Sequence, residues 1–192
     1  MKEGAKTSKM SPDEQLMIQV KNGHIDKMSG LFERYHIAIY NYFRKMQLDK
    51  GLSEDLTQTV FERALKYRHT FQNEYVFRPW LYRIASNVRN DHFRGLKKER
   101  EKEEHIKKSL LSNSYTIDDH SSDRKEYLKL ALKKLDPDQR ELIYLTKYEN
   151  MKYAEVGALL GYSESNVKVK IFRAMKSLKN HYFKIDKNAT RG

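Results

Sequence analysis

Residues 153–178 constrain the fold most, because they carry the pattern of a helix, a tight turn and a second, basic helix. The first helix has an apolar face at helical spacing, formed by Val156, Leu159 and Leu160. Gly161 stands where a helix C-terminus favours a residue that tolerates positive φ. Ser163 can cap the following helix by accepting a backbone N–H, and Glu164 suits its positive dipole end.

The second helix of this segment is predicted to be buried on one stripe and cationic elsewhere. The stripe at helical spacing consists of Val167, Ile171, Ala174 and Leu178. A helix held by such a stripe, with a free basic face, is what a helix-turn-helix needs to enter a DNA major groove. The alternative is an ordinary helical hairpin with a solvated lysine face. We favour the helix-turn-helix because turn, cap, stripe and charge agree.

The composition favours a polyanionic partner and gives no support to catalysis. The 192 residues include 38 Lys and Arg against 26 Asp and Glu, a formal charge of +12. There is no cysteine, no HExxH motif and no glycine-rich phosphate loop, so we expect no catalytic residue, no metal site and no cofactor. No apolar run has the length of a membrane span and the N-terminus is polar, so we expect a cytoplasmic protein.

Helical periodicity along the rest of the chain predicts an all-α fold of two small helical domains joined by a flexible linker. Capping patterns at Ser11-Pro12 and Asp136-Pro137 mark helix starts, Ser53 is predicted to cap another helix, and Gly23 is predicted to end the first. A further helix is expected to begin at Trp80. The predicted organisation is a flexible N-terminus (1–10), a first domain (11–97), a linker (98–122), a second domain (123–183) and a flexible C-terminus (184–192).

The end of the first domain combines basic and aromatic residues. Residues 78–100 hold seven Arg or Lys against two acidic residues, and aromatic residues are interleaved from Phe71 onward. Cations can follow phosphates while aromatic faces stack on unpaired bases, so this mixture suits opened or single-stranded DNA. Several of these large residues are expected in the core instead: Trp80, Leu81 and Ile84. Phe71 could serve either role. The better candidates for contacts share a helical side: Arg83, Asn87 and Asn90.

A second surface is predicted on the helix 53–67, whose polar face is not basic. It consists of Asp55, Gln58, Thr59 and Glu62. In a basic protein, such a face suits a protein partner better than DNA, although a polar helix face often meets only water.

These segments together resemble the extracytoplasmic-function (ECF) sigma factors of bacterial RNA polymerase. The resemblance is carried first by LFERYHIAIYNYF, DLTQTVFERAL and FRPWLYRIASNVRNDHFR, which are similar to region two of that family. LDPDQRELIYL and the helix-turn-helix segment are similar to its region four. FxxWLYRIAxN together with NVKxxxxRAxxxL makes the combination fairly specific.

The resemblance implies a role for each surface. Region four would bind the promoter −35 element through Ser165, Asn166, Lys168, Val169, Lys170, Phe172, Arg173 and Lys176. Region two would bind the −10 element through Phe71, Tyr75, Arg78, Arg83, Asn87 and Asn90. The polymerase would be bound through Asp55, Gln58, Thr59, Phe61 and Glu62. The implied partners are bacterial core RNA polymerase (the clamp of the largest subunit and the flap), promoter DNA and an anti-sigma factor.

Three positions depart from the family pattern. Arginine is common where this chain has Lys168, and Val169 cannot donate a hydrogen bond to a base. Gly157 stands where alanine is usual, which costs a helix up to about 1 kcal/mol.

Two other functions remain open from the sequence. A dimeric helix-turn-helix regulator would bind two-fold operators, but it leaves the helix at 55–61 and the segment after Phe71 without a role. A nucleic-acid enzyme such as a recombinase would need a nucleophile or a carboxylate metal cluster in a convincing setting, and we find neither.

Overall fold

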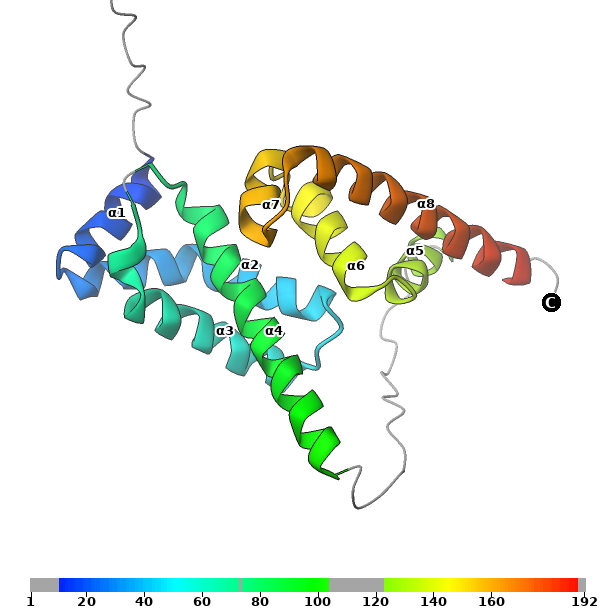
Figure 1. The fold of residues 1–192 in the computed structure, drawn as a ribbon, viewed down its shortest axis with the longest axis horizontal. Helices are drawn as coiled ribbons and strands as arrows, with labels where there is room; N and C mark the ends of the chain where they lie inside the picture. Colours follow the sequence, from blue (N-terminus) through cyan, green and yellow to red (C-terminus); the bar gives the residue numbers. More distant parts are fainter. Residues whose placement is uncertain (1–10, 73, 104–122, 190–192) are drawn as a thin grey trace, which may run out of the picture. The chain divides into compact units, whose positions relative to one another are not determined.

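The computed structural model describes residues 11–72, 74–103 and 123–189, and every regular element among them is helical (Figure 1). The all-α prediction is therefore confirmed. The chain divides into two compact units, residues 1–44 with 48–88 and residues 45–47 with 89–192. The predicted N-terminal segment 1–10 and residues 104–122 of the predicted linker lie outside the described residues.

The first unit contains three complete helices, two short 3-10 turns and the start of a fourth helix. These elements are α1 (Pro12–Lys21), η1 (Ile25–Lys27), α2 (Met28–Lys45), α3 (Lys50–Lys66), η2 (Arg68–Thr70) and α4 (Phe77–Glu103). The predicted start of α1 is confirmed, because the Ser11 N–H donates to the Glu14 carboxylate at 2.9 Å in a capping box. Its end is also confirmed, since Gly23 has a φ of +106° just beyond the helix.

The second unit contains the rest of α4, from Arg89 onward, and the remaining helices. These remaining helices are α5 (Asp123–Lys133), α6 (Pro137–Ile143), the π-helical turn η3 (Tyr144–Tyr148), α7 (Tyr153–Leu160) and α8 (Glu164–Ala189). The predicted cap of α6 is confirmed, because the Asp136 carboxylate accepts the Asp138 N–H at 3.0 Å.

Three of the predicted boundaries are wrong. Asp49 rather than Ser53 caps α3, accepting the Leu52 N–H at 2.9 Å, while Ser53 is buried one turn inside the helix. α4 begins at Phe77 instead of Trp80, because its first backbone N–H has a side-chain acceptor from α1. α4 also continues through Glu103, so the helix occupies part of the predicted linker.

The C-terminal boundary is wrong as well, because α8 continues to Ala189 where residues from 184 onward were expected to be flexible. Tyr182 and Ile185 pack against the core of the second unit, which gives this last part of the helix an apolar anchor. The polar and charged residues around Ile185 concealed that anchor from the sequence pattern.

Large aromatic and aliphatic side chains fill the core of the first unit. Those that are fully buried include Tyr42, Tyr82, Phe43, Phe71, Phe77, Met17, Leu31, Ile39 and Leu81. The core placement predicted for Leu81 and Ile84 is confirmed, whereas Trp80 is half-buried, with its ring 5.4 Å from that of Phe71. Burial of this many large apolar groups supplies the main driving force for folding a unit of this size.

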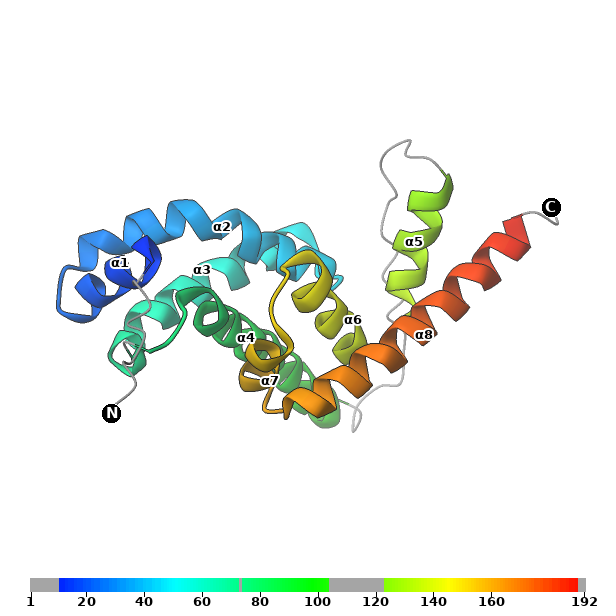
Figure 2. The same cartoon turned by 90° about the horizontal axis from the view of Figure 1, so that it is seen from above.

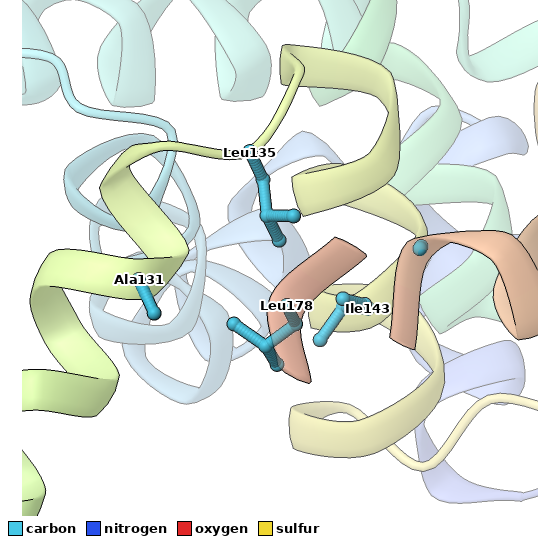
Figure 3. Packing of buried hydrophobic residues seen from close by; sticks show 5 residues of the cluster. Ala131, Leu135, Ile143 and Leu178 are labelled. Carbon is cyan, nitrogen blue, oxygen red and sulfur yellow. The ribbon is translucent and has the colours of Figure 1, made fainter. Parts of the chain in front are cut away.

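In the second unit, α8 is the element against which α5, α6 and α7 all pack. The core cluster joins Ala131 and Leu135, from the α5 region, with Ile143 of α6 and Leu178 of α8 (Figure 3). Figure 2 shows one end of α5 next to the middle of α8, in agreement with these contacts. The predicted stripe of α8 is confirmed, since all four of its members are buried: Val167, Ile171, Ala174 and Leu178.

A buried arginine closes the end of α5. The Arg140 Nε donates to the Leu132 carbonyl at 3.0 Å, and its Nη2 donates to the carbonyls of Lys133 and Leu135 at 3.1 and 2.7 Å. These carbonyls lie at the negative end of the helix dipole, where a cation is favourable. Burial lowers the pKa of Arg140, but a guanidinium stays charged in this setting. Arg140 therefore fixes the turn between α5 and α6.

Gly157 lets the turn of the helix-turn-helix lie directly against α7. A Cβ at this position would lie 2.5 Å from the carbonyl oxygen of Tyr162, and the Tyr162 N–H donates to the Gly157 carbonyl at 2.8 Å. The departure from alanine thus has a packing reason: the backbone of the turn occupies the space of the missing methyl group.

We predict that Gly157→Ala lowers the free energy of unfolding by about 1–3 kcal/mol, because the turn must move away from α7. Gly95→Ala in α4 is the matched control, since nothing lies within 4 Å of its Cβ and alanine favours a helix. Urea unfolding of the full chain, followed by circular dichroism, measures both variants. A Gly157→Ala protein as stable as the Gly95→Ala protein would contradict the packing argument.

Candidate nucleic-acid and protein interfaces

The helix-turn-helix is fixed by three local features. Gly161 ends α7 with a φ of +76°, in the left-handed region that glycine adopts without strain. The Ser163 hydroxyl accepts the Asn166 N–H at 3.2 Å and so caps α8, as predicted. The buried stripe of α8 then fixes the rotation of the helix about its axis, so the remaining faces point outward.

The outward face of α8 carries the predicted DNA-binding residues. Those that are exposed are Ser165, Asn166, Lys168, Val169, Phe172, Arg173 and Lys176, and Lys170 is half-buried. No predicted residue of this set lies in the core. The arrangement therefore presents four cations and several polar groups on one side of a single helix.

Two of these cations already have partners within the protein. The Lys168 Nζ lies 2.8 Å from the Glu164 carboxylate, and this hydrogen bond raises the pKa of Lys168. The Lys170 Nζ lies 4.5 Å from the ring centre of Tyr162, a cation–π geometry that aims it toward the turn. Arg173 and Lys176 are exposed farther along the helix. The four cations thus lie in different environments, which the sequence pattern did not reveal.

An apolar strip crosses the same face. Val169, Phe172 and Met175 follow at intervals of three residues and are 46%, 72% and 40% exposed. Sequence reasoning missed Met175, whose spacing from Phe172 was the available signal. Exposed apolar groups at the centre of a cationic helix face are unusual for a surface that meets only water.

The outward side of α4 carries polar and basic groups. Arg83, Asn87 and Asn90 are all exposed and follow one side of the helix, as predicted. The Asn90 side-chain oxygen accepts hydrogen bonds from the Arg89 guanidinium at 3.1 and 3.3 Å, which orients its amide. Arg78, in the first turn of α4, is half-buried.

In the segment between η2 and α4, Phe71 does not lie on the surface that its predicted role requires. Phe71 is fully buried and packs against Phe77 and Trp80 with ring centres 6.3 and 5.4 Å away, so its predicted contact with a −10 base is wrong for this conformation. The physical reason is that the small unit needs this ring in its core. Tyr75 is 40% exposed, in accord with its prediction, and the neighbouring Val76, which sequence reasoning missed, is also exposed.

The predicted protein-binding face of α3 is mostly accessible. Asp55, Gln58 and Glu62 are exposed, and Thr59 is half-buried with its hydroxyl donating to the Asp55 carbonyl at 2.9 Å. Phe61 is buried, so its predicted direct contact is wrong for this conformation: it packs edge-to-face against Phe32 of α2 at 4.9 Å.

A shallow groove of about 280 Å³ lies beside this face, between α2 and α3. It is lined by Phe32, His36, Ile37, Tyr40, Glu54, Thr57 and Gln58. Ile37 is 61% exposed although it is a large aliphatic residue. Sequence reasoning missed this groove; its signal was the position of Ile37 outside the buried stripe of α2, which contains Leu31, Ile39, Tyr42 and Phe43.

No helix in the described part of the chain is long and apolar enough to span a membrane. Two protein-family models match the chain, one in each half of the sequence. Residues 31–99 match the family Sigma-70 region 2, and residues 125–178 match Sigma-70, region 4.

Curated relatives and solved structures extend this likeness to most of the chain. The chain is 32% identical to the ECF RNA polymerase sigma factor SigM of Bacillus subtilis, over 79% of this chain and 93% of that protein. It is 31% identical to SigX of the same organism, over 79% of this chain and 81% of SigX.

Among solved structures, CnrH in complex with the cytosolic domain of CnrY matches with a TM-score of 0.65 at 25% identity, covering 88% of this chain and 96% of that one. RpoE in complex with the anti-sigma factor NepR from Bartonella quintana matches with a TM-score of 0.68 at 22% identity, covering 82% and 97%, and supports the fold. With both sigma-70 regions in order, and with SigM and SigX matched over 93% and 81% of their lengths, the chain belongs to the ECF RNA polymerase sigma factors.

Proposed function

We propose that this chain directs promoter-specific transcription initiation through three separate surfaces. The outward face of α8 binds the −35 duplex, the side of α4 with Tyr75 binds the opened −10 strand, and the exposed face of α3 binds core polymerase. The observation that carries the proposal is the outward face of α8, where all the predicted −35 residues are exposed or half-exposed while the opposite stripe is buried.

The −35 surface fits a duplex for geometric reasons. A B-DNA major groove admits one α-helix, and base edges there offer hydrogen-bond groups and the thymine methyl group. Arg173 has a planar donor fork that suits a guanine edge or a phosphate, whereas the other cations are lysines. Glu164 reduces the net charge near Lys168, so Arg173 and Lys176 are expected to contribute more to phosphate binding.

The −10 surface suits an opened strand. Asn87 and Asn90 offer amide donors and acceptors, Arg83 offers a cation, and Tyr75 offers an exposed aromatic ring. Aromatic rings stack on unpaired bases, and a base taken out of the duplex is recognised by its hydrogen-bonding edge. Phe71 is omitted from this surface because it is buried, and it is assigned to support of the segment instead.

The polymerase surface combines acidic residues of α3 with the groove beside them. Asp55 and Glu62 supply negative charge, and Gln58 belongs to both the polar face and the groove lining. A polar rim beside exposed apolar residues is typical of protein interfaces. The proposed partner regions are the clamp of the largest subunit and, for the second unit, the flap.

An anti-sigma factor is the proposed regulator, since the similar protein RpoE was solved in complex with one. The protein would act in the cytoplasm and would supply no catalytic group, because the polymerase carries out the chemistry. The prediction of no metal and no cofactor is retained as part of this proposal.

The test of the polymerase surface is charge reversal on α3. We predict that Asp55→Lys with Glu62→Lys lowers the affinity of the full chain for core polymerase roughly tenfold or more, because complementary charge is replaced by repulsion. Fluorescence anisotropy of the labelled chain titrated with core measures this. Glu33→Lys, an exposed reversal on α2, is the matched control. Equal losses in both proteins, or none, would contradict the assignment of α3.

The apolar strip of α8 yields a prediction about the DNA sequence. Val169 and Phe172 are expected to contact thymine methyl groups, which are the apolar groups of major-groove base edges. Replacing thymine with deoxyuridine in a −35 duplex selected from a random library should weaken binding about fourfold for each contacted methyl. Phe172→Ala should reduce this sensitivity, because only the methyl contacts of Val169 remain. Phe183→Ala, which removes another exposed ring of α8, should retain it. Equal affinity of the wild-type chain for both duplexes would refute thymine contact.

A further inference from the structure

Helix α1 holds both ends of the segment that joins η2 to α4. At the end nearer α4, the Glu14 Oε1 accepts the backbone N–H of Phe77 at 2.8 Å, and Glu14 is only 8% exposed. At the end nearer η2, the Lys21 Nζ donates to the Phe71 carbonyl at 2.7 Å. A carboxylate and an ammonium on one helix therefore hold the two residues between which the exposed Tyr75 lies.

The two charged residues, Glu14 and Lys21, lie on the same side of α1. Glu14 and Lys21 are seven residues apart, which is two helical turns, so they lie on one side of α1 about 10 Å apart along its axis. α1 is itself anchored in the core by Met17 and Val20, both fully buried. The two charged side chains therefore extend from a helix whose position is fixed by the core.

Each bond suits the backbone group that it reaches. Phe77 is the first residue of α4, where N–H groups lack a partner within the helix and the dipole favours negative charge. The Glu14 carboxylate is oriented in turn by the Ser11 N–H, which donates to its other oxygen at 2.9 Å. The Phe71 carbonyl accepts a charge-assisted hydrogen bond, which is stronger than a neutral one.

We propose that Glu14 and Lys21 are positioning residues that set the separation of Phe71 and Phe77, and thereby hold Tyr75 in place for an unpaired base of the −10 element. α1 precedes the span 31–99 that matches Sigma-70 region 2, so the family match does not include these residues. The inference rests on the −10 role proposed above, because the positioned segment has to be the one that meets the opened strand.

The alternative is that these bonds only stabilise the fold. Asp13 offers a matched control, because it is an acidic residue of the same turn whose bonds go to α2 instead. Its carboxylate accepts from the Tyr35 hydroxyl at 2.6 Å and pairs with Arg34. Asp13→Asn should therefore loosen α1 without releasing the segment between Phe71 and Phe77.

The experiment compares Glu14→Gln, Lys21→Met, Lys21→Arg and Asp13→Asn in the full chain. Polymerase assembled with each variant is titrated with a fork-junction oligonucleotide that exposes the −10 strand, and separately with the −35 duplex. We expect Lys21→Met and Glu14→Gln to weaken fork binding about tenfold while binding to the −35 duplex changes less than twofold. Lys21→Arg keeps the positive charge, so it should bind the fork as tightly as the wild type does. Asp13→Asn should leave fork binding unchanged.

Hydrogen exchange of the free protein gives a readout that needs no promoter. The Phe77 amide should exchange faster in Glu14→Gln than in Asp13→Asn. Unchanged fork binding in Lys21→Met, or an equal loss in Asp13→Asn, would overturn the positioning role. If the wild-type assembly bound the −35 duplex but not the fork, the −10 function itself would be refuted, whatever the variants do.

Discussion

The apolar stripe of α8 is the constraint on which the second unit depends, because α5, α6 and α7 each pack against this helix. The same stripe fixes which residues face outward, since burying Val167 and Ile171 leaves Lys168, Phe172 and Arg173 exposed. Core packing and DNA recognition therefore share one helix, and a change that rotates α8 would alter both. Gly157 and Arg140 complete this arrangement by allowing a close turn and by closing α5.

In the first unit, a short helix adds directed polar bonds to the apolar core. α1 has ten residues, too few to be a stable helix alone, so its buried Met17 and Val20 must hold it in the unit. Once held, its charged residues satisfy backbone groups of distant segments, which α4 needs because its first N–H lacks an intrahelical acceptor. Burial raises the pKa of Tyr35, and its hydrogen bond to the Asp13 carboxylate raises it further, so this link stays intact at ordinary pH.

The sequence predicted most of the features that local chemistry determines, with the cap of α3 as an exception, because Asp49 rather than Ser53 caps that helix. The caps at Ser11, Asp136 and Ser163, the turn at Gly161 and the stripe of α8 all depend on residues within one or two helical turns. Features set by tertiary contacts were missed. Phe71 and Phe61 were assigned to surfaces by the family resemblance but are buried, because a small unit places its large rings in the core. The bond from Glu14 to Phe77 joins residues 63 positions apart, so no local pattern could predict it.

The central claim is that this chain makes core RNA polymerase initiate at particular promoters, and mapping of transcription start sites tests it most directly. Purified core polymerase with and without the full chain would transcribe bacterial genomic DNA, and the 5′ ends of the transcripts would be sequenced. The account predicts discrete start sites that appear only with the chain and share paired −35 and −10 elements. Transcripts identical with and without it, together with tight binding of the isolated chain to palindromic duplexes, would contradict the account and indicate a dimeric regulator.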